Sequence, residues 1–287
     1  MSSPTPGTYI EGGCSDKDIK GYIGLPPTVH ENLSTKPTAQ KHFLELTDFG
    51  LGPLPTDKAK RDYLNFYGNL MVESDQYLVE IMDKLDRKRL LDNTLVIYTS
   101  DHGEMGMSHN GQRQKCFNFY EETLRVPLVF SNRKLFRAPR RSPAMVSHVD
   151  FLPTLAGLFD VPAAARANWE GVDYSRLVLD AKAKSVQDYV VFTYDDFQVG
   201  QPNPPYVPPP NHITSIREER YKLAKYYDTS EDNPVPEQWE MYDLQKDPNE
   251  VQNIAYPDFK RTKQQEAELA RRKAKLAEVE RTRLQPL

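Results

Sequence analysis

The sequence contains little cysteine and no long hydrophobic run. Its 287 residues include two cysteines, Cys14 and Cys116, which are far apart and form no Cys-x-x-Cys pair. One disulfide is the most they can form, so a disulfide framework or a cysteine-based zinc site is excluded. No apolar run approaches the ~20 residues that span a bilayer. The segment Met1 to Thr8 has neither a charged nor an apolar part, so no signal peptide is predicted.

The sequence also lacks a strong charge of either sign. It has 37 Lys and Arg against 41 Asp and Glu, for a net charge of −4, with 38% hydrophobic and 27% charged residues. This composition is typical of a globular chain, and its charge balance gives no electrostatic argument for binding nucleic acid or an anionic membrane. In residues 259–283, nine basic side chains are interleaved with four glutamates. We interpret that segment as a solvated helix.

Three regions differ in their residue pattern. Residues 1–57 are rich in Pro, Gly, Ser and Thr and show no sustained period, which predicts an irregular N-terminal arm. Residues 58–184 combine helical and strand-like patterns and are predicted to form an α/β unit. Residues 185–287 change pattern again and are predicted to form a small α+β subdomain.

The middle region has the order helix, strand, loop, strand, helix. Apolar residues between 58 and 91 recur mostly every three or four positions, which predicts a long amphipathic helix, on Tyr63, Tyr67, Leu70, Tyr77, Leu78, Ile81, Met82 and Leu85. Residues 94–99 (TLVIYT) form an apolar run typical of a parallel strand covered on both faces. A second strand is predicted at Val126 to Phe130. A helix capped by Asp150 is predicted to run to about Phe159.

The last region predicts a small antiparallel sheet followed by a helix. Val190 to Tyr194 is a short strand, and residues 199–212 hold six prolines, which favour an extended loop. A hairpin is predicted from residues 213–216 and 221–226, and another strand from residues 240–244. The terminal helix is predicted to dock through a stripe of small side chains, Ala267, Ala270, Ala274 and Ala277.

Polar residues with metal-binding chemistry follow the first strand directly. Asp101 offers a hard carboxylate oxygen and His102 an imidazole nitrogen, and both suit a divalent cation. Ligands in α/β sheets gather beyond the carboxyl ends of strands, where these residues lie. Gly103 allows a sharp turn there. His109 follows in a stretch expected to be flexible, from which it is predicted to contact a substrate.

These residues belong to a longer series of spaced motifs. In the middle region the series is TLVIYTSDHG (94–103), Glu104, Lys115, Tyr120-Glu121-Glu122, Arg125-Val126-Pro127-Leu128, Val149-Asp150, Pro153-Thr154-Leu155 and Glu170-Gly171. It continues with Ile216-Arg217, Arg220-Tyr221-Lys222-Leu223, Met241-Tyr242-Asp243-Leu244, Asp247-Pro248-Asn249-Glu250 and Asn253. Over residues 58–255 this order resembles the sulfatase family of the alkaline-phosphatase superfamily.

The resemblance implies a fold and a set of roles. Residues 58–184 would be the C-terminal part of a sulfatase-like catalytic domain, within an alkaline-phosphatase-like mixed or parallel sheet with helices. Residues 185–287 would be the family's C-terminal subdomain. Asp101 and His102 match positions of metal ligands, and Lys115 matches a catalytic lysine that contacts the sulfate and the nucleophile. The metal would be calcium, or manganese or magnesium, because an imidazole nitrogen softens the site.

One part of the family pattern is missing. Sulfatases carry a Cys-x-Pro/Ala-x-Arg motif whose cysteine becomes formylglycine, but neither Cys14 nor Cys116 lies in that context. We therefore expect a truncated sulfatase-like hydrolase that is inactive alone. We also expect the helix at 58–91 and the strand at 94–99 to expose apolar surface that further strands would cover.

Other functions remain open at this point. A phosphonate monoester or phosphodiester hydrolase of the same superfamily is one, because this chain has Asp-His where many sulfatases have Asp-Asn. A non-catalytic scaffold is another, because the nucleophile motif is absent. The expected substrate is a small-molecule or carbohydrate sulfate ester, with no nucleic-acid partner and no membrane span.

Overall fold

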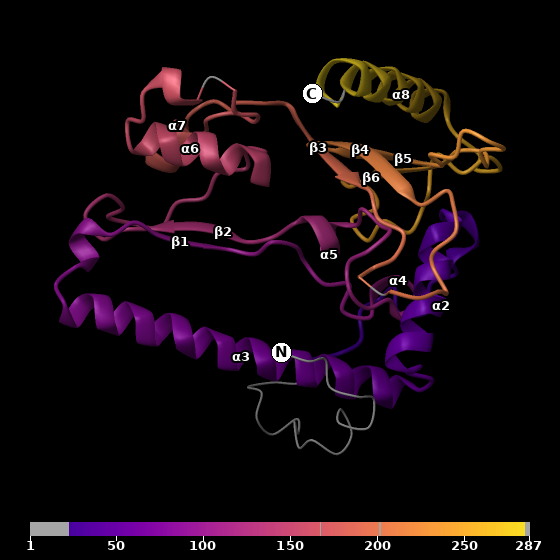
Figure 1. The fold of residues 1–287 in the computed structure, drawn as a ribbon, viewed down its shortest axis with the longest axis horizontal. Helices are drawn as coiled ribbons and strands as arrows, with labels where there is room; N and C mark the ends of the chain where they lie inside the picture. Colours follow the sequence, from indigo (N-terminus) through magenta and orange to yellow (C-terminus); the bar gives the residue numbers. More distant parts are fainter. Residues whose placement is uncertain (1–22, 167, 201, 285–287) are drawn as a thin grey trace.

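Two β-sheets of different size, with helices beside each, make up this α/β fold (Figure 1). The computed structural model describes residues 23–166, 168–200 and 202–284. The smaller sheet pairs β1 (Val96–Thr99) with β2 (Leu128–Ser131). The larger sheet has the order β3-β4-β5-β6. The mixed α/β class, with a small antiparallel sheet and a C-terminal helix, is the one predicted. Cys14 lies outside the described residues.

Helices of very different length connect and flank the strands. The longest are α3 (Asp57–Arg87) and α8 (Lys263–Arg283), followed by α2 (Thr38–Leu51). Shorter segments are η1 (Leu33–Thr35), η2 (Leu91–Asn93), α4 (Ser108–Gly111), α5 (Glu121–Leu124), η3 (His148–Asp150), α6 (Phe151–Leu158), η4 (Ala163–Arg166) and α7 (Ser175–Leu179). In the described ranges, no helix combines the length and apolarity needed to cross a membrane.

The N-terminal region contains a helix that the sequence pattern did not predict. α2 interrupts the expected irregular arm and places three apolar side chains in the core, Ala39, Phe43 and Leu46. They pack with the segment around Phe117 and with the larger sheet. The helical spacing is present in the sequence, but it extends over only four turns between Pro- and Gly-rich flanks. The prediction of an irregular arm was therefore wrong for residues 38–51.

The long helix α3 is confirmed, but only its first turns are buried. Thr56 caps it by accepting a hydrogen bond from the Ala59 amide. Tyr63 and Leu64 are buried, whereas Tyr77 and Ile81 are more than half exposed. The apolar stripe therefore lacks cover over most of its length within the described part of the chain.

Strand β1 forms where predicted, but its neighbouring strand is antiparallel instead of parallel. β1 pairs antiparallel with β2, so that Ile97 lies opposite Phe130. Within the described residues β1 has this one neighbouring strand, and Tyr98 is 41% exposed. The prediction of a parallel strand covered on both faces is thus wrong for this sheet. An apolar, β-branched run indicates a strand suited to burial, but it does not specify the neighbour.

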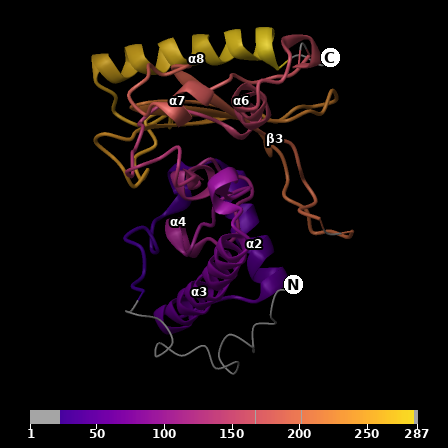
Figure 2. The same ribbon diagram turned by 90° about the vertical axis from the view of Figure 1, so that its left-hand side faces the viewer.

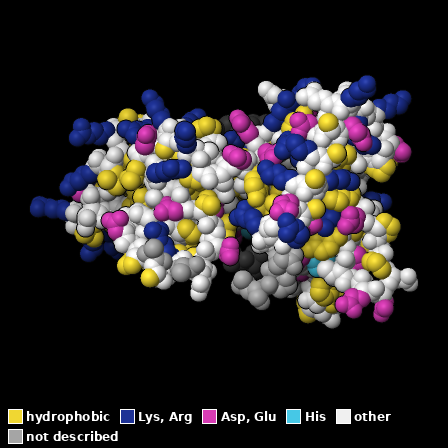
Figure 3. Space-filling view, turned by 90° about the horizontal axis from the view of Figure 1, so that it is seen from above, with side chains coloured by type: hydrophobic (Ala, Val, Ile, Leu, Met, Phe, Trp, Pro, Cys, Tyr) yellow, Lys and Arg dark blue, Asp and Glu magenta, His cyan; other side chains and the backbone are white. Residues whose placement is uncertain are grey.

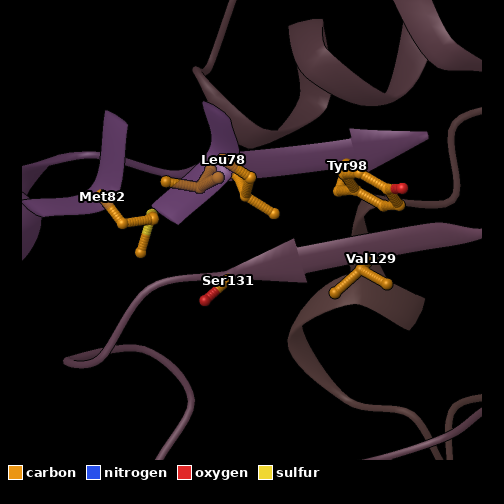
Figure 4. A pocket seen from close by; sticks show the side chains of 6 residues that line it. Leu78, Met82, Tyr98, Val129 and Ser131 are labelled. Atoms are coloured by element: carbon orange, nitrogen blue, oxygen red, sulfur yellow. The ribbon is translucent and has the colours of Figure 1, made fainter. Parts of the chain in front are cut away.

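An apolar groove separates this sheet from α3 (Figure 4). Leu78 and Met82 of α3 line one side, and the other side comes from the sheet, through Val96, Tyr98, Val129 and Ser131. The groove has a volume of about 270 Å³. The expected exposure of apolar surface on the helix and the strand is therefore confirmed. We call this feature the α3–sheet groove.

The other face of the small sheet meets α6 and α7. Phe130 of β2 packs edge-on against Tyr174, with ring centroids 6.3 Å apart. Asp150 is buried and accepts hydrogen bonds from the Ser147 amide at 2.8 Å and the Gln187 side chain at 2.6 Å. Asp150 thus closes a capping box with Ser147 around η3, while its side chain makes no cap bond to α6. The prediction that the Asp150 side chain caps this helix was therefore wrong, because the capping side chain is that of Ser147, about one turn earlier, at the start of η3.

The larger sheet is antiparallel throughout, as predicted. Its strands are β3 (Tyr189–Tyr194), β4 (His212–Glu218), β5 (Tyr221–Tyr227) and β6 (Gln238–Asp243). Figure 2 shows α8 along one face of this sheet, with α2, α3 and α4 on the other side. Two hydrophobic clusters fill these two interfaces. The hairpin β4–β5 turns at Glu219 and Arg220, and Arg220 makes a two-pronged ion pair with Asp243.

The docking face of α8 differs from the predicted alanine stripe. Ala267, Ala270, Ala274 and Ala277 are all exposed. The buried face instead consists of Leu269, Arg272, Leu276 and Val279. Larger apolar side chains remove more apolar area from water than alanine does, so they determine which face packs.

Candidate active site

The chain turns sharply at the end of β1, and Asp101 and His102 lie in this turn. The Ser100 hydroxyl donates to the His102 carbonyl at 2.7 Å, and the His102 amide donates to Asp101 Oδ1 at 2.9 Å. This amide bond is the main reason that the pKa of Asp101 is below its usual value, with the nearby imidazole as the next cause. Asp101 is 85% exposed and His102 is 40% exposed. Both predicted ligands therefore lie at the carboxyl end of β1 and open to solvent.

The imidazole of His102 is oriented by its own backbone. Nδ1 lies 2.8 Å from the Gly103 carbonyl oxygen, and Nε2 lies 3.5 Å from Asp101 Oδ2. A proton on Nδ1 satisfies the carbonyl and leaves the lone pair of Nε2 on the side of Asp101. One oxygen ligand and one nitrogen ligand therefore converge from adjacent residues.

Gly103 is required here for space. A Cβ atom at this position would lie 1.9 Å from the carbonyl oxygen of Glu122, and the Gly103 amide donates to the Thr123 carbonyl at 2.8 Å. The close contact with α5 explains the glycine better than a sharp turn, because its φ is not in the left-handed region. This contact fixes the position of the Asp101–His102 turn relative to α5.

The donor set fits a divalent cation but does not complete a site. Among the described residues, no cluster of three or more His, Cys, Asp or Glu side chains is placed to bind a metal ion. Calcium takes roughly six to eight oxygen ligands. Asp101 and His102 can therefore supply two ligands of a larger set.

Lys115 lies at the end of the loop 104–115, and hydrogen bonds to the Glu104 side chain bring the two ends of this loop together. Glu104 Oε1 accepts hydrogen bonds from the amides of Gly106 at 3.3 Å and Gln114 at 2.9 Å. Burial raises the pKa of Glu104, while these bonds and the charge of Lys115 act in the opposite direction. Lys115 is half-buried. No hydrogen bond or ion pair among the described residues joins it to Asp101 or His102.

His109 lies in the interior of the protein, contrary to the expectation of a flexible loop. Its side chain is fully buried, and Nδ1 lies 2.5 Å from Glu31 Oε2. Nε2 lies 3.7 Å from Glu122, and the ring stacks on Tyr120. Backbone bonds to Thr28 hold His109 and Asn110 in place. In this conformation the predicted substrate contact has no open surface, and it stays a prediction.

The interior holds a polar network that sequence reasoning missed. Lys36 is fully buried; Nζ pairs with Glu31 at 3.0 Å and donates to Tyr242 at 2.9 Å. Glu240 accepts from the hydroxyls of Tyr226 at 2.6 Å and Tyr242 at 2.5 Å. The network joins the segment before α2 to the larger sheet. No local pattern marks it, because its members lie on segments far apart in the chain.

Glu121 of α5 forms ion pairs with two basic side chains of the larger sheet. Glu121 pairs with Arg217 and Lys222, both at 3.2 Å, and Lys222 is fully buried. Burial raises the pKa of Glu121, but these two cations lower it by more. Arg125 is exposed, and no ion pair among the described residues includes it. Glu121 and Glu122 thus anchor α5 in the interior, behind the Asp101–His102 turn.

Comparison with protein families gives two overlapping matches. Residues 25–161 match the model described as Sulfatase. Residues 110–280, more than half of the chain, match the model described as N-sulphoglucosamine sulphohydrolase, C-terminal. Together the two matches cover residues 25–280, which include both sheets and Asp101, His102 and Lys115.

Curated proteins with similar sequences have related descriptions. Arylsulfatase K of Rattus norvegicus is 33% identical over 204 residues, which cover 70% of this chain and 33% of the relative. The N-acetylglucosamine-6-O-sulfatase of Bacteroides thetaiotaomicron is 29% identical over 198 residues, which cover 68% of this chain and 32% of the relative. The chain thus spans about a third of the length of these relatives.

Solved structures support the fold. One is a protein in complex with its substrate D-glucosamine-2-N,6-O-disulfate, with a TM-score of 0.72, 19% identity, and coverage of 97% of this chain and 62% of that protein. Another is the phosphonate monoester hydrolase of Agrobacterium radiobacter, with a TM-score of 0.64, 20% identity, and coverage of 88% and 50%. At these identities the likeness establishes the shared fold alone.

Proposed function

The chain belongs to the sulfatase family, and on that premise we propose that it forms part of the active site of a metal-dependent sulfuric ester hydrolase. The observation that carries the proposal is the pairing of Asp101 and His102 at the end of β1, oriented by Ser100 and the Gly103 carbonyl. One exposed carboxylate and one imidazole nitrogen on a rigid turn suit a divalent cation.

Each site residue has a distinct proposed role. Asp101 and His102 hold the cation, which when bound polarises a sulfate ester oxygen. Lys115 provides a fixed positive charge that stabilises negative charge on the attacking or leaving oxygen. Glu104 and the loop that it closes position Lys115. Calcium, manganese and magnesium remain candidates, and the imidazole ligand makes manganese at least as suitable as calcium.

The proposed substrate is a carbohydrate sulfate ester. A relative is described as an N-acetylglucosamine-6-O-sulfatase, and a protein of the same fold binds a disulfated glucosamine. Exposure of Asp101 and His102 is consistent with a substrate that approaches from solvent.

Metal binding tests the proposal without requiring turnover. We expect calorimetric titration of the purified chain with manganese or calcium to show weak binding at one site. Asp101→Ala or His102→Ala should abolish it. His148→Ala is the matched control, because His148 is an exposed histidine that contacts the Ser100 carbonyl without belonging to the proposed ligand set. Equal binding by the Asp101 and His148 variants would contradict the proposed site.

We further propose that these 287 residues alone have no appreciable sulfatase activity. The sequence contains no Cys-x-Pro/Ala-x-Arg motif, and covalent catalysis needs its nucleophile. Residues that act as a unit lose most of their effect when one is absent. The assay follows release of a chromogenic phenol from its sulfate ester in the presence of divalent metal. Turnover that Asp101→Ala abolishes would show a complete enzyme.

A second candidate reaction is phosphonate monoester hydrolysis. The imidazole ligand at His102 favours it, and a phosphonate monoester hydrolase shares the fold. Parallel assays with a phenyl phosphonate ester and the phenyl sulfate distinguish the two reactions when they are run on a protein that carries this chain together with the nucleophile segment, because both rates then report on one site.

A further inference from the structure

A strip of unpaired basic side chains lies on the unit formed by α6 and α7. Residues 131–149 contain five Lys or Arg and no Asp or Glu. Two of these, Arg133 and Lys134, pair with Asp92, and Arg133 also pairs with Asp86. The other three, Arg137, Arg140 and Arg141, are exposed. In the described part of the chain, no ion pair includes them.

A second segment brings more positive charge to the same place. Arg140 Nη1 lies 3.4 Å from the carbonyl of Leu179, the last residue of α7. Further along, the Gln187 side chain donates to the Met145 carbonyl at 3.2 Å. Hydrogen bonds therefore join residues 140–145 to residues 179–187 at both ends. Lys182 and Lys184 are exposed on this second segment, and Arg176 is exposed on α7, which ends where the segment begins.

We define the basic strip as these six side chains, Arg137, Arg140, Arg141, Arg176, Lys182 and Lys184. None of them forms an ion pair with a described carboxylate. In Figure 3 several dark blue side chains, with some magenta ones between them, lie on the lobe on the left, which is the α6–α7 side of Figure 1. Helix α8 is also basic, but Arg271, Arg272 and Lys275 pair with Glu218. The positive charge of the strip is thus free to bind an external anion.

The strip is connected to the candidate active site by its own chain. His148 Nε2 lies 2.8 Å from the carbonyl oxygen of Ser100, next to Asp101. Arg141 is seven residues from His148, so the two Cα atoms are at most about 25 Å apart. A polymer several sugars long can therefore reach the strip and the Asp101–His102 turn together.

We propose that the basic strip binds the sulfated polysaccharide chain whose sulfate ester reaches the proposed active site. The inference rests on the proposed function for its choice of polyanion. Four of the six side chains are arginines, whose planar guanidinium groups match the oxygens of oxyanions such as sulfate. Residues 137–147 and 176–184 contain no Phe, Tyr, Trp or His side chain on which a nucleic-acid base could stack. The strip therefore suits a polyanion that is recognised by its charged groups.

Equilibrium binding of dextran sulfate tests the inference. The strip variant carries Arg137→Gln, Arg140→Gln and Arg141→Gln. The control carries Lys263→Gln, Arg281→Gln and Arg283→Gln, three exposed positions on α8 with the same loss of charge. We expect the strip variant to weaken binding at least about fivefold, and the control to change it less than about twofold, because three exposed charge contacts are lost. Raising the salt concentration should reduce the difference.

The remaining probes decide between partners. Unsulfated dextran of the same length should not bind. Equal weakening in both variants would overturn the inference, as would tighter binding to oligothymidylate or to phosphatidylserine vesicles than to dextran sulfate. Circular dichroism of both variants verifies the fold. Since binding is measured without turnover, failure of the proposed hydrolysis does not affect the interpretation of this result.

Discussion

The ring of His109 lies flat on the ring of Tyr120, with centroids 3.6 Å apart and planes inclined by 9°. Glu31 and Glu122 approach the two nitrogens of the same imidazole. The arrangement joins the N-terminal segment, the loop around α4, and α5. His109 is therefore a buried contact between these three segments, and its protonation in the folded state can be tested.

The unfolding free energy should depend on pH through His109. Burial lowers the pKa of His109, but the nearby carboxylates of Glu122 and Glu31 raise it by more, so the folded pKa lies above the ordinary value. The folded state therefore holds this proton more tightly than the unfolded state. Its stabilisation is complete below the unfolded pKa of about 6.5 and is lost as pH rises through the folded pKa.

Urea unfolding from pH 5 to pH 9 measures this effect. The unfolding free energy should fall above about pH 6.5, and His109→Gln should remove that part of the slope. His30→Gln is the control, because His30 is exposed and pairs with Asp57 at the surface. An unchanged slope in His109→Gln would show that His109 does not carry a proton in the fold.

Replacing Lys36 by methionine should destabilise the protein strongly. The side chain keeps similar bulk, but Glu31 and the Tyr242 hydroxyl lose a buried partner. Breaking a buried ion pair on one side costs roughly 3 to 5 kcal/mol. Lys41→Met is the matched control, since Lys41 is exposed and pairs with Glu45 on the surface of α2. It should change the unfolding free energy by less than about 0.5 kcal/mol.

Gly103→Ala should disturb the turn that holds Asp101 and His102. The new methyl group would meet the Glu122 carbonyl oxygen at 1.9 Å, and the backbone must move to accommodate it. We expect a loss of about 1 to 3 kcal/mol in thermal or urea unfolding. Gly24→Ala, where no atom lies within 4 Å, should be near neutral. Equal stability of the two variants would contradict the close packing of this turn against α5.

The α3–sheet groove should make the isolated chain bind apolar dyes and self-associate. Its lining is almost entirely apolar and accessible, and among the described residues β1 and β2 each have an open edge that invites further pairing. Tyr98→Ser with Val129→Thr should lower both dye fluorescence and the concentration dependence of sedimentation. Leu135→Ser with Leu179→Ser changes two other exposed apolar residues away from the groove and serves as the control. If the groove is the main site of dye binding and self-association, the groove variant should lower both signals and the control variant should not.

Local patterns in the sequence were sufficient for most elements. The period of α3, the strands of the larger sheet and the turn after β1 each depend on residues within a few positions of one another. The same holds for the adjacent pair Asp101 and His102, whose place at a strand end follows from one apolar run and one glycine. These predictions agree with the structure because backbone preference and short-range spacing determine them.

Burial and partners were decided by the tertiary structure. The sequence suggested the alanine face of α8, but packing against β4 and β5 selected Leu269, Leu276 and Val279. It also suggested a covered parallel strand, whereas β1 found an antiparallel partner and open apolar surface. Helical period and strand composition say that a face is apolar, not what covers it.

His102 and His109 show most clearly what the sequence determined and what the tertiary structure decided. The sequence by itself determined that His102 ends a strand beside Asp101, since adjacent residues and a turn are enough. Only the tertiary structure decided that His109 is buried, because Glu31 lies 78 positions away along the chain. Gln40 and Glu240, 200 positions apart, meet in the same interior. Contacts across such distances depend on the packing of whole elements, and no local pattern encodes them.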